Sequence, residues 1–153
     1  MTIKSFSFVI PGDPKGKERP RSARNGHFYT PKATHMYEAM VRYLARAGLR
    51  TIDEKMTPLE CPVSVDIEAV YKIPKSYTKK RKEACMSGAE LPTKKPDGDN
   101  IIKAILDGMN PQKKRRMTIL DGVYKDDSQV TACSIKKRYG ASPEVRVKVS
   151  WHE

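Results

Sequence analysis

Cysteine, acidic side chains and long apolar runs are all scarce in this sequence. The three cysteines are an odd number and form no Cys-x-x-Cys pair, which excludes a disulfide framework and argues against a zinc finger. We expect them to be small buried thiols in a reducing compartment. No apolar run approaches the roughly 20 residues of a membrane span. The first residues lack the small-residue cleavage site of a signal peptide, so the expected location is the cytoplasm, with no membrane contact.

Positive charge, in contrast, is abundant. The 153 residues include 30 Lys and Arg against 18 Asp and Glu, a net charge of +12. Such an excess favours a polyanionic partner, most often nucleic acid, over a merely basic soluble protein. With 38% hydrophobic residues the chain is globular. Its length fits one domain, residues 1–153, that buries a core without disulfides or a structural metal.

Hydrophobic spacing predicts the order β-α-β-(α)-α-β-β. Strands are expected at 3–10, 62–73, 129–138 and 144–151, and helices at 33–47, 78–86 and 99–109. The first helix should bury Tyr37, Met40, Val41 and Leu44 and end at Gly48. The predicted fold class is α/β (α+β): a mixed sheet of about four strands packed with helices.

Two basic segments stand out between these elements. In the predicted loop 11–33, positively charged residues occupy every second position, so an extended chain would point them the same way and let them follow a phosphate backbone. They are Lys15, Lys17, Arg19 and Arg21. A solvated, mobile loop is the competing interpretation. A second basic loop, 110–118, carries Lys113, Lys114, Arg115 and Arg116, which extend a DNA contact or belong to a disordered segment.

The aspartates are concentrated in one part of the chain. Six of the nine lie between residues 97 and 127, where there is no glutamate: Asp97, Asp99, Asp107, Asp121, Asp126 and Asp127. Short carboxylates are hard oxygen ligands suited to Mg²⁺ or Mn²⁺. Without a cation they would repel the phosphates of a nucleic acid. The cluster therefore predicts a divalent-metal site on a DNA-binding surface.

The segment Asp97-Gly98-Asp99-Asn100 lies where an extended chain enters a helix. Residues i and i+2 of an extended chain point to the same side, so both carboxylates can face one ion; alternatively they are only turn and cap residues. Lys103 and Asp107 follow at four-residue intervals on the face of Asp99. Either this lysine is aimed at a phosphate or the three residues form ordinary helical ion pairs.

Taken with VYKDDSQV at residues 123–130, the segment KPDGDNIIKAILDGMN resembles the RusA family of Holliday junction resolvases, common in bacteria and their prophages. The shared pattern is D-x-D-N-x-x-K opening a helix, an Asp one turn later, and then D-D-x-Q-[VI]. The opening FVIPGDPKGKERPR and the segment HFYTPKATHMYE resemble phage-borne members. The likeness follows the whole chain in order, and the two Asp motifs together are specific.

This resemblance implies a RusA-like compact domain and a metal-dependent nuclease site. Asp97, Asp99 and Asp127 match the family's acidic residues for Mg²⁺ and catalysis, with Mn²⁺ as a substitute, and Lys103 matches its essential lysine. Asp126 matches a further acidic position that supports the metal site. The chain between Asp107 and Asp126 is longer than in compact members, but the spacing to Ser128-Gln129-Val130 favours Asp127 over Asp121.

The expected activity is therefore a Mg²⁺-dependent endodeoxyribonuclease that resolves four-way DNA junctions by paired nicks. Family members act as homodimers, so two symmetric sites would cut opposite strands. The resemblance places the enzyme in the cytoplasm of a bacterial or phage-infected cell, in DNA recombination or repair. Two alternatives stay open: an endonuclease of the same chemistry that prefers flaps or forks, and a DNA-binding protein without activity.

Overall fold

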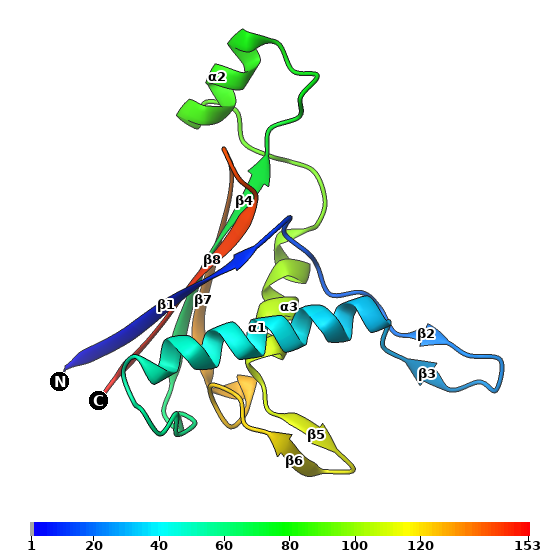
Figure 1. Ribbon diagram of the computed structural model, residues 1–153, viewed down its shortest axis with the longest axis vertical. Helices are drawn as coiled ribbons and strands as arrows, with labels where there is room; N and C mark the ends of the chain where they lie inside the picture. Colours follow the sequence, from blue (N-terminus) through cyan, green and yellow to red (C-terminus); the bar gives the residue numbers. More distant parts are fainter. Residues whose placement is uncertain (1) are drawn as a thin grey trace.

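Period-two alternation of apolar residues builds a four-stranded sheet in the computed structural model, which describes residues 2–153. The strands are β1 (Ile3–Pro11), β4 (Val63–Lys72), β7 (Val130–Gly140) and β8 (Glu144–His152) (Figure 1). Their order is β1-β8-β4-β7, with β4 and β7 parallel and the other neighbours antiparallel. The predicted mixed sheet is confirmed.

Three α-helices accompany the sheet: α1 (Lys32–Arg50), α2 (Lys79–Ser87) and α3 (Gly98–Met109). α1 packs on both β1 and α3, and α3 also packs on β7, so the two helices cover the buried face of the sheet. The core is one cluster that includes Val41 of α1 and Ile105 of α3. Glycine permits the close packing of these two helices, because a Cβ at Gly108 would lie 2.5 Å from Val41 Cγ1.

Two details of the predicted first helix are wrong. The helix does not end at Gly48 but runs through it to Arg50. A Cβ at this position would lie 2.6 Å from a ring carbon of Phe6, so the glycine serves close packing against β1 and not a helix stop. Met40, placed in the apolar stripe, is 37% exposed, and Ala45 and Leu49 are buried with Tyr37 instead.

Both basic loops contain a short β-hairpin. β2 (Arg21–Ser22) pairs with β3 (Phe28–Tyr29), and β5 (Gln112–Lys114) pairs with β6 (Met117–Leu120). The prediction that 110–118 lacks regular structure is therefore wrong. Arg115 and Arg116 form the turn, both with positive φ, a conformation that residues other than glycine adopt only rarely. Both hairpins project from the sheet and helices (Figure 1).

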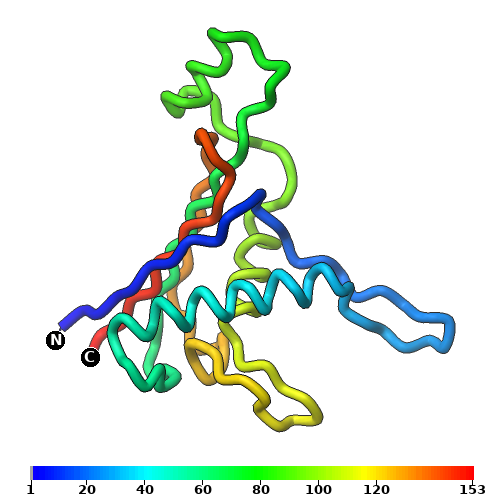
Figure 2. The backbone as a smooth tube through the Cα atoms, viewed as in Figure 1, coloured from blue at the N-terminus to red at the C-terminus, as the bar shows by residue number. Residues whose placement is uncertain are grey.

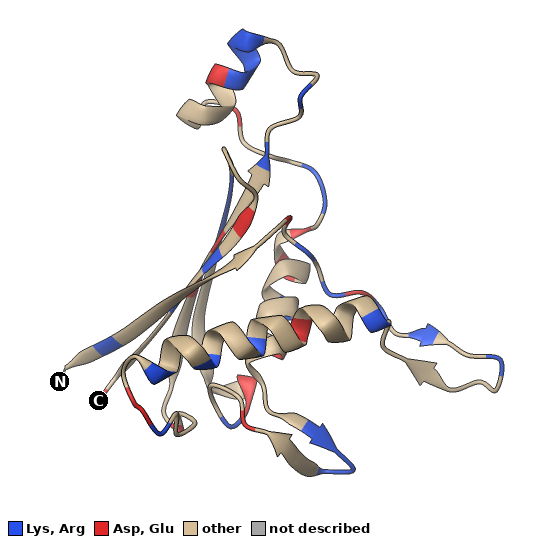
Figure 3. Cartoon of the chain, viewed as in Figure 1, with Lys and Arg blue, Asp and Glu red and all other residues tan. Residues whose placement is uncertain are grey.

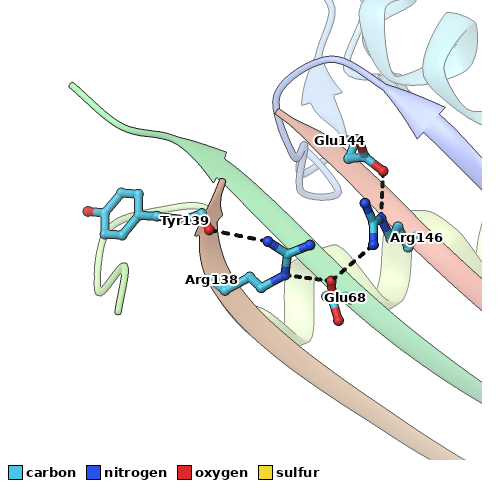
Figure 4. A network of polar contacts seen from close by, with 5 residues as sticks. All are labelled: Glu68, Arg138, Tyr139, Glu144 and Arg146. Atoms are coloured by element: carbon cyan, nitrogen blue, oxygen red, sulfur yellow. Dashed lines mark hydrogen bonds and ion pairs between the residues drawn. The ribbon is translucent and has the colours of Figure 1, made fainter. Parts of the chain in front are cut away.

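The face of the sheet opposite the core is polar. Glu68 on β4 accepts from Arg138 Nε of β7 at 2.6 Å and lies 3.9 Å from an Arg146 nitrogen of β8 (Figure 4). Glu144 pairs with Arg146 at 2.7 Å in the same network. These cross-strand pairs hold three strands in register on their solvent side.

The two ends of the described chain lie side by side (Figure 2). Ile3 pairs with His152 between β1 and β8, and the Lys4 ammonium lies 2.7 Å from a carboxylate oxygen of Glu153. Within residues 2–153, none of the helices has the length and apolar character needed to cross a bilayer.

The cysteines are free, as expected, but their predicted burial holds for only one of them. Cys85 is buried, Cys61 is half-buried, and Cys133 is exposed on the edge strand β7. An edge strand lacks a neighbour on one side, which explains the exposure of Cys133 where a buried thiol was expected.

Candidate active site

The chain is held in place directly before Asp97. The Tyr71 hydroxyl and the Lys137 ammonium both donate to the carbonyl oxygen of Pro96, at 3.0 and 3.2 Å. The Lys137 ammonium also lies 5.1 Å from the centre of the Tyr71 ring. Two strands, β4 and β7, thus fix the position at which the chain enters α3.

The two carboxylates at the start of α3 do not perform the structural tasks that their positions suggest. Asp97 is the N-cap residue, yet its side chain makes no capping hydrogen bond. Asp99 lies in the first turn, and both residues are exposed. Lys103, one turn later, is also exposed. Among residues 2–153 none of the three forms an ion pair, so the interpretation as helical pairing is not supported and these charges are free to contact a ligand.

Asp107, near the other end of α3, pairs with Lys17 and not with Lys103. The Lys17 ammonium lies 3.1 Å from Asp107 Oδ2 and also bonds to Glu38 of α1. Burial lowers the pKa of Lys17, but the hydrogen bonds to Glu38 and Asp107 outweigh it, so the pKa lies above its usual value. Lys17 thus joins the basic loop to both helices.

The adjacent aspartates of the second motif have different surroundings, in and before the 3₁₀ helix η1 (Asp127–Gln129). Asp126 caps η1: it accepts from the Ser128 backbone at 2.9 Å, while the Gln129 side chain bonds back to the Asp126 backbone. Hydrogen bonds from Ser128 hold the Asp126 pKa below its usual value. Asp127 is half-buried and accepts from the Asn110 side chain at 3.0 Å. Of the two, Asp126 is the one committed to local structure.

Tyr124 lies beneath this second group of carboxylates. It is completely buried and donates from its hydroxyl to the Leu106 carbonyl at 2.7 Å. Burial raises its pKa, and the charges of Asp127, Asp107 and Asp126 raise it further. The bond to Leu106 places the Tyr124 hydroxyl at the C-terminal part of α3, the end at which Asp107 lies.

The predicted site residues fall into two groups. Asp97 and Asp107 are ten residues apart on α3, about 15 Å along the axis at 1.5 Å per residue. Asp127 bonds to Asn110, at the Asp107 end. Within residues 2–153, no three His, Cys, Asp or Glu side chains come close enough together to hold a metal ion. In one chain Asp127 therefore lies at the C-terminal end of α3, away from Asp97 and Asp99 at its N-terminal end.

The predicted DNA-binding residues are exposed, with one exception. Lys15, Arg19 and Arg21 are exposed, whereas Lys17 is turned inward by the carboxylates of α1 and α3. The four basic residues of the β5–β6 hairpin, 113–116, are all exposed. Figure 3 shows Lys and Arg on both hairpins, with acidic segments between them near α3.

Sequence reasoning did not identify Glu38 or Asn110 as part of this region. Glu38 meets Lys17 across 21 residues, and Asn110 meets Asp127 across 17. Asn110 is also held through its carbonyl, which accepts from Arg42 Nε at 2.8 Å. Both are the last residues of segments that carry the family resemblance, HFYTPKATHMYE and KPDGDNIIKAILDGMN, but the resemblance assigns them no role. The contact of α1 with α3 and the contact of α3 with η1 bring them into this region.

Comparison with known proteins adds two findings. Residues 11–150 match the family described as "Endodeoxyribonuclease RusA". The chain is also 34% identical over 149 residues to the uncharacterized protein YqaN of Bacillus subtilis (strain 168), covering 94% of each chain. Both matches extend over almost the whole length, and the family match runs from the basic loop to β8.

Proposed function

Because this chain belongs to the RusA family of endodeoxyribonucleases, we propose that it resolves four-way DNA junctions by paired, Mg²⁺-dependent nicks. The observation that carries the proposal is the state of Asp97, Asp99 and Lys103. All three are exposed and have no partner in the described chain, although Asp97 is ideally placed to cap α3. Charges left free at a fixed helix start are what a metal and a phosphate require.

Asp97 and Asp99 fit a magnesium ion. Mg²⁺ keeps several waters and is usually bound through one or two carboxylates together with substrate phosphates, so two free aspartates can supply its first protein ligands. A bound Mg²⁺ would polarise the phosphoryl oxygen and stabilise the leaving oxygen. The strands that fix Pro96 keep the Asp97 backbone in place for this task.

Lys103 is the residue we assign to charge stabilisation. It lies one turn after Asp99 and carries the only cation of α3, residues Gly98–Met109. An ammonium without a carboxylate partner is available to the negative charge that grows on the phosphate in the transition state. Asp127 completes the proposed set as a metal ligand, with Asp126 holding η1 beneath it.

The DNA arms would lie along the exposed basic residues of the two hairpin regions. Lys15, Arg19 and Arg21 belong to the first, and Lys113, Lys114, Arg115 and Arg116 belong to the second. We further propose that the enzyme works as a homodimer, because two symmetric sites produce two symmetric nicks. In a single chain Asp127 lies at the opposite end of α3 from Asp97, a separation that a second copy can bridge.

The deciding experiment is cleavage of a synthetic, immobile four-way junction with and without Mg²⁺, beside a linear duplex of the same sequence. Paired nicks in opposite arms, with the duplex intact, are expected. Tight binding without Mg²⁺-dependent cuts on junctions, flaps or forks would contradict the catalytic proposal. If flaps or forks are cut faster than four-way junctions at equal concentration, they are the preferred substrate instead of the junction.

A further inference from the structure

A cleft of about 530 Å³ adjoins Asp97 and is not used by the proposed chemistry. Its walls are the basic loop at residues 14–18, the start of α1, and residues 95–100 at the start of α3. The loop is held against α3, because the Lys17 backbone N–H donates to the Asn100 carbonyl at 3.0 Å. A Cβ at Gly16 would lie 3.0 Å from Asn100 Cβ. The volume is in the range of sites that hold a small organic ligand.

Tyr37 lines this cleft, and its hydroxyl proton has no acceptor in the described chain, although the Lys15 backbone N–H faces the hydroxyl oxygen. The side chain is only 5% exposed, and burial raises its pKa to about 12, an effect that the Lys15 backbone N–H opposes in part. Leaving a buried hydroxyl unpaired costs free energy, so such a group points to a missing partner. The O–H proton lacks an acceptor, and an acceptor atom of a ligand would supply it.

The charges around the cleft indicate which kind of group enters. Three lysines and three carboxylates line it, and Lys17 is paired with Glu38, so the lining has no net charge and favours a neutral group in the interior. Lys15 and Lys95 are both exposed, and their ammonium groups favour a phosphate on the solvent side of the cleft. A neutral ring with carbonyl or ring-nitrogen acceptors, attached to a phosphate backbone, satisfies both conditions.

We propose that this cleft binds one unpaired base of the DNA strand beside the cut, with Tyr37 donating its hydroxyl proton to an acceptor of that base. The inference rests on the proposed function, since it takes the DNA at Asp97 as substrate. Tyr37 is then a specificity-determining residue, because the four bases present different acceptors to a fixed donor.

An extruded base also gives a physical reason for preferring branched DNA. Removing a base from a duplex costs unpairing and unstacking, and the cost is smallest where the base is already unpaired. Bases at a branch point meet this condition, whereas those of an intact duplex do not. The cleft therefore favours cutting next to a branch.

The test uses four junctions that differ only in the nucleotide next to the branch. The wild type should cut them at different rates, and Tyr37→Phe should reduce the ratio of the fastest to the slowest by about two- to tenfold, the range of one hydrogen bond. Tyr43→Phe, on the same helix with a side chain that is 75% exposed, is the matched control and should keep the wild-type ratio. Equal rates for the wild type, or an unchanged ratio in Tyr37→Phe, would overturn the proposal.

A second measurement separates this proposal from the catalytic one. With 2-aminopurine at the branch and no Mg²⁺, wild-type binding should increase the fluorescence as the base leaves the stack. Ala33→Trp, which fills the cleft at an exposed position, should abolish the increase, while Ala47→Trp, exposed on the same helix, should not. If the fluorescence increases with the wild type and not with Ala33→Trp, but the wild type cuts no DNA, base binding in the cleft is supported and the proposed nuclease activity is refuted. If the fluorescence increases equally with the wild type and with Ala33→Trp, base binding in the cleft is refuted and the proposed nuclease activity is not affected.

Discussion

The two ends of α3 carry similar side chains in opposite states. At the N-terminal end Asp97, Asp99 and Lys103 are exposed and unpaired within the described chain. At the C-terminal end Asp107 is paired with Lys17, and Asp127 accepts from Asn110. A carboxylate paired with a cation, such as Asp107, contributes to the fold, whereas one without a charged partner is available to a ligand. Asp127 belongs to the second kind, because its bond comes from a neutral amide and reaches only Oδ2. The comparison thus separates charges that act on the substrate from charges that hold the site together.

Removing a free carboxylate should have the largest effect. We expect Asp97→Asn to lower the cutting rate by at least about a hundredfold, as for other groups that stabilise transition-state charge, while junction binding stays the same or tightens. Asp121→Asn is the control, because it also removes one exposed negative charge. Cleavage by Asp97→Asn at the wild-type rate, in a time course on junction DNA, would show that the assignment of Asp97 is wrong.

The next largest loss of cutting rate is expected for Lys103→Met. The rate should fall by about tenfold to a hundredfold through the lost interaction with the phosphate, and the unfolding midpoint should not change, because Lys103 has no partner in residues 2–153. The test is to measure both the cutting rate and the unfolding midpoint of the same variant. A variant that unfolds earlier than the wild type would show that this lysine belongs with the structural charges after all.

Lys17→Met should show the reverse pattern. It leaves Glu38 and Asp107 without their cation, and we expect a loss of about 1–3 kcal/mol in the free energy of unfolding. Because the pKa of Lys17 is raised in the fold, its contribution is complete below the usual value of 10.5 and disappears as the pH rises through the higher folded value. Urea unfolding at neutral and alkaline pH measures this, with Lys15→Met as control; a variant as stable as the wild type would refute it.

The adjacent aspartates offer a finer comparison. Asp126→Ala removes the cap of η1 and should lower the unfolding midpoint, since its carboxylate bonds to the Ser128 backbone. Asp127→Ala should lower the cutting rate more than the stability. Thermal unfolding and cleavage are measured on both. If Asp126→Ala instead lost activity at full stability, the two roles would have to be exchanged.

The smallest effect concerns the salt dependence of DNA binding. Replacing one exposed arginine of the β5–β6 hairpin, as in Arg115→Ala, should reduce the slope of log affinity against log salt by about 0.9 if that residue contacts one phosphate. Lys17→Met should leave the slope unchanged, because its ammonium is already occupied. Titrations at several salt concentrations compare the two. Equal slopes for Arg115→Ala and the wild type would show that Arg115 of this hairpin does not contact a DNA phosphate.

Much of the fold followed from local patterns, and much of the site did not. The strict alternation from Val63 to Tyr71 predicted β4, because period-two burial leaves few alternatives. The hairpin at 112–120 was missed, since its turn uses two arginines with positive φ, where glycine or asparagine would have been the signal. Lys17 was misplaced for another reason: spacing within a loop says nothing about carboxylates on distant helices.

The sequence by itself determined the strand and helix segments, the net positive charge and the positions of the acidic motifs, because these depend on residue type and spacing along the chain. It also carried the family membership that the comparison establishes. The tertiary structure decided which charges are paired, and it placed Tyr37 in the wall of a cleft with no acceptor for its hydroxyl proton. Such properties arise when α1, α3 and the basic loop pack together. Contacts between residues far apart in the chain produce no periodic pattern in the sequence from which they could be predicted.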